Sequence, residues 1–407
     1  MKIAAPPGTH DVLAKDWPNW DRIVTEAQRL CALYGYAPIT TPGFEDTDLF
    51  ARTSGAGSDV VQKEMYTFVD RGDRSLTLRP EGTAPIARAY LEHGLHRDPQ
   101  PQKLYTIAPM YRYSRPQRGR YREHWQLSVE AMGSEDPAVD AEVIQLFDRL
   151  LRDLGVTEYR LELNSIGDRS CRPAYVEALT EWLNAHDRDL DDEARQKRET
   201  SPLRIFDVKN EDVLEALASA PTIDEFLCDK CREHFGAVRL ALDAYEVQYD
   251  IAPRLVRGLD YYTRTTWEFL GPEGGAQSSI SGGGRYDYLI EEIGGPPTPG
   301  VGFGAGIERM HLAVGEGAPP GKPIEVFFAF EDTSRRTEVL PLLAKLRAQG
   351  RACDTDYAGR SLKGQLTQAQ RLGAKTVVIA KAAGFTVRLR GREDVDVQTV
   401  EELEALL

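Results

Sequence analysis

Residues 103–132 read KLYTIAPMYRYSRPQRGRYREHWQLSVEAM, and this stretch decides the fold. Two runs of strand-like composition, Lys103 to Tyr113 and Trp125 to Met132, flank a short polar segment. The second run alternates between an apolar set and a polar set of side chains, which are Trp125, Leu127, Val129 and Ala131 against Gln126, Ser128 and Glu130. The pattern predicts an antiparallel hairpin whose polar face can orient a small polar ligand. A half-exposed strand at a sheet edge would give the same alternation.

The segment between the two runs is rich in arginine. Five of the eleven residues from 112 to 122 are arginines, at positions 112, 115, 118, 120 and 122, in a chain whose formal net charge is -14. A guanidinium group matches phosphate oxygens and keeps its charge at physiological pH, so the cluster indicates phosphate binding. The alternative is an ordinary solvated loop, which is where clustered charges usually lie.

Glycine is concentrated in a second stretch. Residues 271–306 contain twelve of the thirty-five glycines, and Gly300, Gly302, Gly304 and Gly306 alternate with Val301, Phe303, Ala305 and Ile307. A strand with this pattern has one face without side chains, which lets another group approach the backbone closely. Glu308 and Arg309 follow where a helix is expected to begin, a position suited to a cation that reaches toward phosphate. Tight packing of a sheet against a helix is the other interpretation.

Composition restricts the class of protein. With 407 residues and 41% hydrophobic content, the chain can build two or three domain cores. We expect a cytoplasmic protein without a membrane partner, since there is neither a run of eighteen apolar residues nor an amino-terminal secretory segment. The nucleotide-binding patterns GxxxxGK[ST] and GxGxxG between a strand and a helix are absent, as are GxSxG and HExxH, which disfavours hydrolases.

Five scattered cysteines are expected to be reduced thiols rather than a disulfide framework. Cys228 and Cys231 form one CxxC pair, and His234 could add a third zinc ligand. The segment also has the composition of the start of an amphipathic helix. Because a fourth ligand is missing, the sequence predicts no metal site.

The order of patterns predicts an α+β protein. Helices are expected around residues 20–34, 83–93 and 139–154, and strands at 36–41, 75–78, 103–113, 125–132, 254–257 and 261–270. Residues 187–200 hold ten charged side chains, typical of a solvated helix or linker, within a mostly helical insertion at about 170–248. After a Gly-Pro-rich linker at 315–323, strands at 324–330 and 376–380 alternate with helical patterns. The last 86 residues, 322–407, carry 14 basic against 12 acidic side chains, so a polyanion could lie against them without the repulsion of the remaining chain.

Several blocks together resemble class II aminoacyl-tRNA synthetases. Arg112 with Arg115 to Arg122 resembles motif 2, Gly302 to Arg309 resembles motif 3, and Gly35 to Pro42 is similar to motif 1. Three further blocks resemble the histidyl-tRNA synthetase family, namely Arg257-Gly-Leu-Asp-Tyr-Tyr-Thr263, Ser281-Gly-Gly-Gly-Arg-Tyr-Asp287 and Leu78-Arg-Pro-Glu-Gly-Thr83. The resemblance implies an antiparallel-sheet catalytic domain at 1–320 with the helical insertion, and an α/β anticodon-binding domain at 322–407.

The resemblance also implies an activity and a set of site residues. The activity is histidine–tRNA ligation by a homodimer, with L-histidine, ATP, Mg²⁺ and tRNA(His) as its partners. Arg112 and Arg257 would contact the α-phosphate as catalytic residues, Arg309 the γ-phosphate, and His124 the adenine. Gln117 and Arg120 would lie in the loop that faces ATP and the tRNA acceptor end. The histidine pocket would comprise Glu81, Gly82, Thr83, Gln126, Glu130, Tyr261, Tyr262 and Tyr286, with Glu130 and Tyr262 reading the imidazole.

The chain departs from the family pattern where Phe then His commonly stand, since it has His124 then Trp125. A flat His124 ring can still stack on adenine. The rival function is a non-catalytic, histidine-sensing regulatory paralogue of the synthetase. Such proteins typically lose motif residues and the final domain, whereas Arg112, Arg257, Arg309 and the α/β tail are all present. A related synthetase for another amino acid is a third possibility, disfavoured by the block at 257–263.

Overall fold

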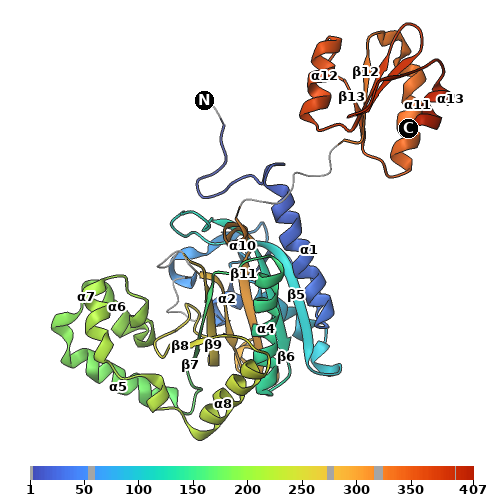
Figure 1. Cartoon of the computed structure of the whole chain (residues 1–407). Coiled ribbons are helices and arrows are strands. Elements are labelled where there is room, and N and C mark those ends of the chain that lie inside the picture. Colours follow the sequence, from blue (N-terminus) through green and yellow to red (C-terminus); the bar gives the residue numbers. More distant parts are fainter. Residues whose placement is uncertain (1–2, 54–59, 273–278, 316–323, 390) are drawn as a thin grey trace. The chain divides into compact units, whose positions relative to one another are not determined.

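The structure, a computed structural model, describes residues 3–53, 60–272, 279–315, 324–389 and 391–407. The chain divides into two compact units, residues 1–317 and 318–407. The division falls in the Gly-Pro-rich linker expected at 315–323, of which 316–323 lie outside the described residues. Each unit is coloured by sequence in Figure 1.

The first unit is built on an eight-stranded sheet of order β1-β5-β6-β11-β10-β9-β7-β8, antiparallel except where β1 pairs with β5 and β7 with β8. Its strands are β1 (Ala37–Pro38), β5 (Gln102–Tyr111), β6 (Glu123–Met132), β7 (Arg160–Ser165), β8 (Asp250–Ile251), β9 (Thr263–Leu270), β10 (Ser279–Arg285) and β11 (Gly300–Gly306). A three-stranded sheet of order β2-β4-β3 consists of β2 (Phe44–Asp46), β4 (Ser75–Leu78) and β3 (Tyr66–Val69). The helices outside the insertion are α1 (Trp17–Leu33), α2 (Thr47–Thr53), α3 (Thr83–Glu92), α4 (Pro137–Asp153), α9 (Leu289–Glu292) and α10 (Ile307–Val314).

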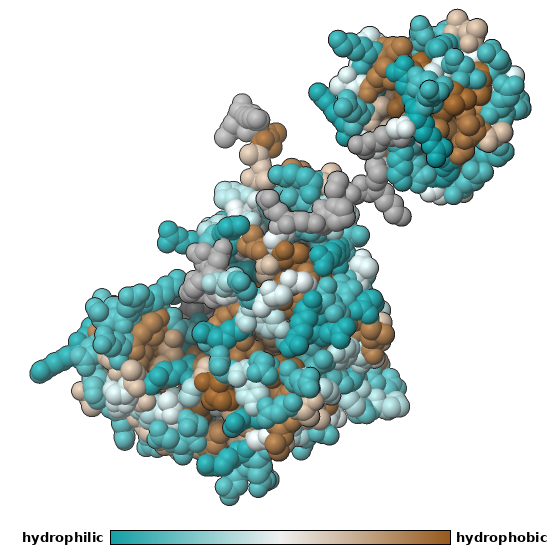
Figure 2. Space-filling view, in the orientation of Figure 1, coloured by the Kyte–Doolittle hydropathy of each residue, from teal (hydrophilic) through white to brown (hydrophobic). Residues whose placement is uncertain are grey.

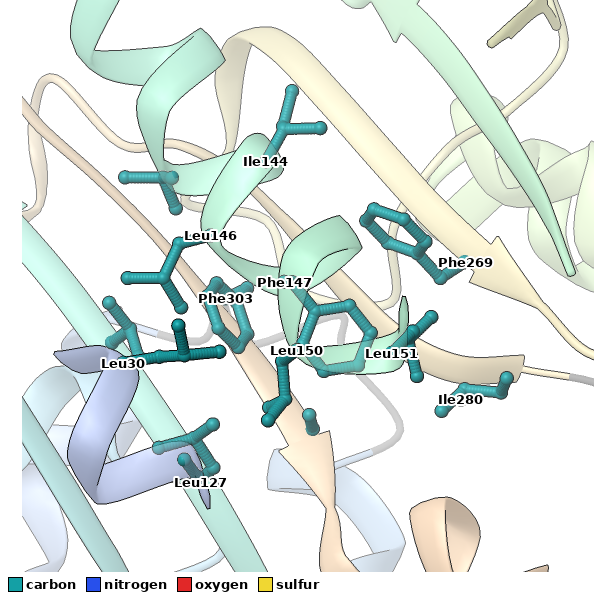
Figure 3. Packing of buried hydrophobic residues seen from close by; sticks show 14 of the residues in the cluster. Leu30, Leu127, Ile144, Leu146, Phe147, Leu150, Leu151, Phe269, Ile280 and Phe303 are labelled. Carbon is teal, nitrogen blue, oxygen red and sulfur yellow. The ribbon is translucent and has the colours of Figure 1, made fainter. Parts of the chain in front are cut away.

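One face of the large sheet packs on α1 and α4. Helix α4 begins after Asp136, whose carboxylate accepts a hydrogen bond from the Ala138 amide (2.9 Å). From there its apolar residues recur at helical spacing and are buried. Figure 3 shows Phe147 of α4 between Phe303 of β11 and Phe269 of β9, with ring centroids 5.1 and 4.9 Å away. The apolar set of β6, residues 127, 129 and 131, belongs to this same core.

The other face of the sheet therefore carries the polar set of β6. Strand β6 lies between β5 and β11, so it is a central strand and not an exposed edge. Gln126, Ser128 and Glu130 are all buried there, with exposed fractions of 9%, 0% and 1%. Polar groups removed from water in this way need partners, so this face is where a ligand site is expected.

The insertion is a helical lobe with a core of its own. It contains α5 (Arg172–Ala185), α6 (Asp192–Thr200), α7 (Glu211–Ala216) and α8 (Asp229–Ala244), and its buried residues include Tyr175, Leu179 and Leu183. In Figure 1, α5, α6 and α7 stand together beside the sheet. The charged segment at 187–200 is mostly the helix α6, which begins after Asp191, whose carboxylate accepts from the Ala194 amide.

The second unit has a five-stranded sheet of order β13-β12-β14-β15-β16. Its elements are β12 (Val326–Phe330), α11 (Arg336–Ala348), β13 (Cys353–Thr355), α12 (Leu362–Arg371), β14 (Thr376–Ala380), β15 (Phe385–Leu389), β16 (Val395–Val397) and α13 (Val400–Leu406). Strands β13, β12 and β14 are parallel, as expected for strands that alternate with helices.

On the face of the molecule that Figure 2 shows, hydrophilic residues predominate, with hydrophobic patches between them. Among the described residues, no helix combines the length and apolar character needed to cross a bilayer.

Two strand predictions are wrong. Residues 254–257 form turns and irregular backbone, and the nearby strand is β8 at Asp250–Ile251. Of the strand expected at 36–41, only Ala37 and Pro38 pair, with Leu104 and Tyr105 of β5. Pro253 directly precedes the first segment and Pro38 lies inside the second. Each lacks a backbone donor, which limits pairing with a neighbouring strand.

Candidate active site

The polar face of the sheet is built around glycines. Register places Gly302 opposite Glu130, Gly304 opposite Ser128, and Gly306 opposite Gln126. On the other side of β11, Gly304 is paired with Gly282, which is in turn paired with Glu268 of β9. This row of glycines, here called the furrow, therefore lies between the polar side chains of β6 and the carboxylate of Glu268.

Each glycine of this furrow is covered by a side chain that the sequence singled out. A methyl group added at the glycine would lie 1.9–3.2 Å from that side chain, so the contact depends on the missing Cβ. The pairs are Tyr286 over Gly300, Glu130 over Gly302, Gln126 over Gly304, Arg309 over Gly306, Arg257 over Gly282 and Tyr262 over Gly284. The glycine pattern and the candidate site residues are thus parts of one arrangement.

Gly302→Ala is expected to destabilise the protein. Its Cβ would lie 1.9 Å from Glu130 Oε2 and 2.4 Å from the Val129 carbonyl oxygen, so a strand must shift. Overpacking of this kind costs about 1–3 kcal/mol of unfolding free energy, which urea denaturation can measure. Gly236→Ala is the matched control, because that position within α8 has no neighbour within 4 Å and alanine favours a helix. Equal stability of Gly302→Ala and the wild type would contradict the furrow geometry.

Glu130 is the centre of a buried polar cluster. Its carboxylate accepts hydrogen bonds from Thr83 Oγ1 (2.7 Å) and from the Tyr286 hydroxyl (2.6 Å). Tyr261 lies against both Tyr262 and Tyr286, with ring centroids 4.6 and 6.0 Å away. The phenol that contacts Glu130 is therefore that of Tyr286, whereas the Tyr262 ring lies over Gly284. An acidic group enclosed by aromatic rings can bind a flat, nitrogen-containing ring.

Burial raises the pKa of Glu130 to about 8, although the hydrogen bonds from Tyr286 and Thr83 oppose this shift. The folded protein then holds a proton that the unfolded chain has released above about pH 4.3. Stability from this group is therefore lost as pH rises toward 8. Glu130→Gln stays neutral, so its stability relative to the wild type should increase between pH 6 and pH 9. Thermal denaturation of both proteins at the two pH values tests this, and an unchanged difference would contradict it.

Glu81 and Gly82 form the entry to α3. The Glu81 carboxylate is buried and accepts hydrogen bonds from the amides of Thr83 (2.6 Å) and Ala84 (2.9 Å). Burial raises the pKa of Glu81, against the lowering effect of these amides and of Arg112. A Cβ on Gly82 would lie 2.3 Å from Ser128 Oγ, so glycine brings the start of α3 against β6. This places a second carboxylate beside the Glu130 cluster.

Arg257 lies over Gly282 and forms an ion pair with Glu268, with 2.9 Å between Nη1 and Oε1. Burial acts to raise the pKa of Glu268, but the charges of Arg257 and Arg309, with nearby hydrogen bonds, lower it. Glu268 was not among the residues predicted from the sequence. Its position between Trp267 and Phe269, both in the core, was the available signal, because alternation puts its side chain on the site face.

Arg112 and Arg309 approach the same region from other elements. Arg112 Nε donates to the Pro80 carbonyl (2.7 Å), one residue before Glu81. Arg309, in the first turn of α10, donates to the carbonyls of Gly119 (2.8 Å) and Ser279 (2.9 Å), which joins the arginine loop to β10. Burial, followed by the charges of Arg112, Arg120 and Arg309, lowers the pKa of His124 to about 3. The ring is thus neutral and surrounded by cations.

The other arginines of the loop differ in their environment. Arg115, Arg118 and Arg120 are exposed, and a backbone pairing between Gln117 and Arg120 closes the loop tip. Arg122 stacks on the Tyr113 ring at 3.8 Å, and its amide donates to Gly8. Of the five, Arg112 therefore lies near Glu81, whose pKa its charge lowers, and the charge of Arg120 lowers the pKa of His124.

An antiparallel sheet with a site face of this kind, flanked by the arginine hairpin and by the glycine strand that runs into α10, defines a class II aminoacyl-tRNA synthetase. The family model described as histidyl-tRNA synthetase matches residues 8–310. A histidine–tRNA ligase of Desulforamulus reducens is 46% identical, over 100% of this chain and 97% of that protein. One from Desulforudis audaxviator is 48% identical, over 93% and 91%.

Solved structures agree. The apo histidyl-tRNA synthetase of S. aureus superposes with a TM-score of 0.82 at 35% identity, covering 100% of this chain and 99% of that one. The chain therefore belongs to the histidyl-tRNA synthetase family. A Bacillus halodurans protein described as an ATP phosphoribosyltransferase regulatory subunit/histidyl-tRNA synthetase shares the fold at 23% identity, with a TM-score of 0.67 over 93% and 98%. That likeness concerns the fold alone, so the regulatory alternative gains no support.

Proposed function

We propose that this chain activates L-histidine with ATP and transfers it to the 3′ end of tRNA(His), using the furrow face of the sheet. The observation that carries the proposal is the joint placement of Glu130, Arg257 and Arg309 over neighbouring glycines of β10 and β11. Membership of the family supports the activity, since its curated relatives are histidine–tRNA ligases that match nearly the whole chain.

In the first step, a carboxylate oxygen of histidine attacks the α-phosphorus of ATP. The bond to the β-phosphate breaks and pyrophosphate leaves. Negative charge builds up on the α-phosphate in the transition state, and we assign Arg112 and Arg257 to stabilise it, with Arg309 on the γ-phosphate. Mg²⁺ would screen the remaining phosphate oxygens when bound.

Histidine would be held at both ends. Glu81, Thr83 and Gln126 are assigned to the α-amino group, and Glu130 with the tyrosines at 261, 262 and 286 to the imidazole. The hydrogen bond from the Tyr286 hydroxyl favours Tyr286 as the direct partner of Glu130. An apolar amino acid of the same shape as histidine would leave the buried polar groups of the site without partners, and such a site disfavours it by roughly 10⁴-fold. The pocket can therefore discriminate without an editing domain.

In the second step, the terminal ribose hydroxyl of the tRNA attacks the acyl carbonyl and AMP leaves. Gln117, at the tip of the arginine loop, is assigned to the acceptor end, Arg120 to ATP, and His124 to the adenine. The unit at 318–407 is assigned to the anticodon, supported by its small excess of basic residues.

A cytoplasmic homodimer is the expected form. Strand β1 is at the edge of the large sheet, with Ala37 and Pro38 exposed. Phe44 and Phe68 on the small sheet are also exposed, 49% and 42%, and their ring centroids are 6.1 Å apart. Exposed apolar groups around a sheet edge suit a subunit interface. Sedimentation should give about twice the mass of one chain; a monomer at micromolar concentration would contradict this.

The function is tested by pyrophosphate exchange into ATP with each of the twenty amino acids. Histidine alone should drive exchange, and tRNA(His) should then accept histidine. A regulatory paralogue would bind histidine without exchange, and a synthetase for another amino acid would exchange with that amino acid. Either result would refute the assignment.

A further inference from the structure

A cluster of four potential metal ligands lies outside the active site, at the base of the helical insertion. Asp168, Cys171, Cys228 and Cys231 each offer one ligand atom, and these four atoms lie within 4.8 Å of one another. Asp168 and Cys171 are 5% exposed, Cys231 is fully buried, and Cys228 is partly exposed. We propose that these four residues bind a structural zinc ion.

The spacing in the chain supports this assignment. Asp168 and Cys171 are separated by two residues, as are Cys228 and Cys231. Two such pairs from distant segments are a common arrangement for a tetrahedral zinc site. The first pair precedes α5 and the second opens α8, so Cys171 and Cys228 occupy the N-cap positions of those helices. A helix N-terminus favours negative charge, which suits a thiolate ligand.

Two separations within the cluster match tetrahedral coordination. With zinc–sulfur bonds of about 2.3 Å, two sulfur ligands should lie about 3.8 Å apart, and a sulfur and a carboxylate oxygen about 3.5–3.7 Å apart. Cys171 Sγ lies 3.8 Å from Cys231 Sγ and 3.6 Å from Asp168 Oδ1. The sulfur separation is well beyond the roughly 2.05 Å of a disulfide bond.

Neighbouring groups hold the ligands in place. The Ser170 amide donates to Asp168 Oδ1 (2.8 Å), and the Asp168 amide lies 3.4 Å from Cys171 Sγ. Arg264 Nη2 lies 3.8 Å from the other carboxylate oxygen of Asp168. Gly167 has φ +63, and a Cβ there would lie 2.7 Å from Cys171 Sγ. Such outer contacts orient ligands at metal sites.

His234, the third ligand considered from the sequence, is not part of the cluster. Its Nε2 lies 3.6 Å from Asp140 Oδ2, beside the buried ion pair of Asp140 with Arg285. The segment around the CxxC pair holds no fourth ligand, because Asp168 and Cys171 precede that pair by about sixty residues.

The ion would fasten the insertion to the sheet next to the proposed histidine pocket. The Ile166 amide donates to the Arg264 carbonyl (2.8 Å), and the Arg264 amide to the Gly167 carbonyl (2.7 Å). Arg172, the residue after Cys171, donates through Nη2 to the Tyr262 carbonyl (2.6 Å). Zinc at this point therefore joins α5 and α8 to the start of β9.

The test measures zinc in the untagged full-length protein, purified under reducing conditions from zinc-supplemented culture. The wild type should contain about one zinc per chain, and Cys228→Ser should lower zinc affinity about tenfold or more. Cys353→Ser, which alters a buried thiol of the other unit, should keep the zinc. Wild-type protein with negligible zinc, or Cys228→Ser with undiminished zinc, would overturn the proposal.

A second measurement starts from the wild-type protein, so its decisive result does not require a variant to fold. Cobalt(II) added to the metal-depleted wild type should give the absorption of a tetrahedral thiolate complex, and zinc should displace it. Asp168→Cys, which supplies a fourth thiolate, should bind cobalt with stronger thiolate charge-transfer absorption. An octahedral cobalt spectrum in the wild type would refute the site. Neither readout involves aminoacylation, so failure here is separable from failure of the proposed function.

Discussion

Arg257→Ala is expected to lower histidine-dependent pyrophosphate exchange by roughly 10²–10³-fold, about 3 kcal/mol in the barrier. The guanidinium lies on bare backbone at Gly282 and is held by Glu268, so its charge is fixed before ATP arrives. Preorganised charge of this kind stabilises the transition state without reorganisation. The effect should appear in kcat/KM for the exchange reaction.

Two controls separate catalysis from folding. Arg254→Ala removes an exposed arginine three residues away, which donates to the Ala218 carbonyl, and should leave exchange nearly unchanged. Arg257→Ala also leaves Glu268 without its ion-pair partner, so the double variant Arg257→Ala/Glu268→Gln should regain stability but not activity. Exchange at the wild-type rate in folded Arg257→Ala would remove Arg257 from the catalytic residues.

Glu130→Ala is expected to reduce kcat/KM for histidine by roughly 10⁴-fold. This is the size of effect expected when one partner of a buried hydrogen bond between a site and its substrate is absent. The change removes the carboxylate that Thr83 and Tyr286 hold, so the imidazole loses its buried acceptor. Steady-state exchange over a range of histidine concentrations measures it.

Glu130→Gln serves as the matched variant. It keeps the shape and the hydrogen-bonding capacity and removes only the ionisable group, so its loss should be smaller than that of Glu130→Ala. If Glu130→Ala folds and binds histidine as tightly as the wild type, the imidazole is read elsewhere in the pocket.

Local periodicity in the sequence was sufficient to predict which residues share one face of a strand. The alternation in β6 and the glycines at every second position of β11 correctly separated the core face of the sheet from its polar face. Strand register between distant segments could not be read in this way. Alternation alone assigns Glu268 to the polar face, but its opposition to Gly282 depends on how β9 pairs with β10.

Two other features of the structure could not be predicted from the sequence for the same reason. The segment at 254–257 has strand-like composition, but it follows β8 as irregular backbone that places Arg257 over Gly282. The ligand cluster around Asp168 joins two helix starts that only the folded insertion brings together. Long-range pairing, and not local propensity, decides both features.

The most direct test is a structure of the protein with histidine and a non-hydrolysable ATP analogue. The α-phosphate should contact the guanidinium groups of Arg112 and Arg257, with the imidazole within hydrogen-bond distance of the Glu130 carboxylate. An analogue bound away from both arginines, or an imidazole that points away from Glu130, would contradict the assignment of this face as the site of histidine activation.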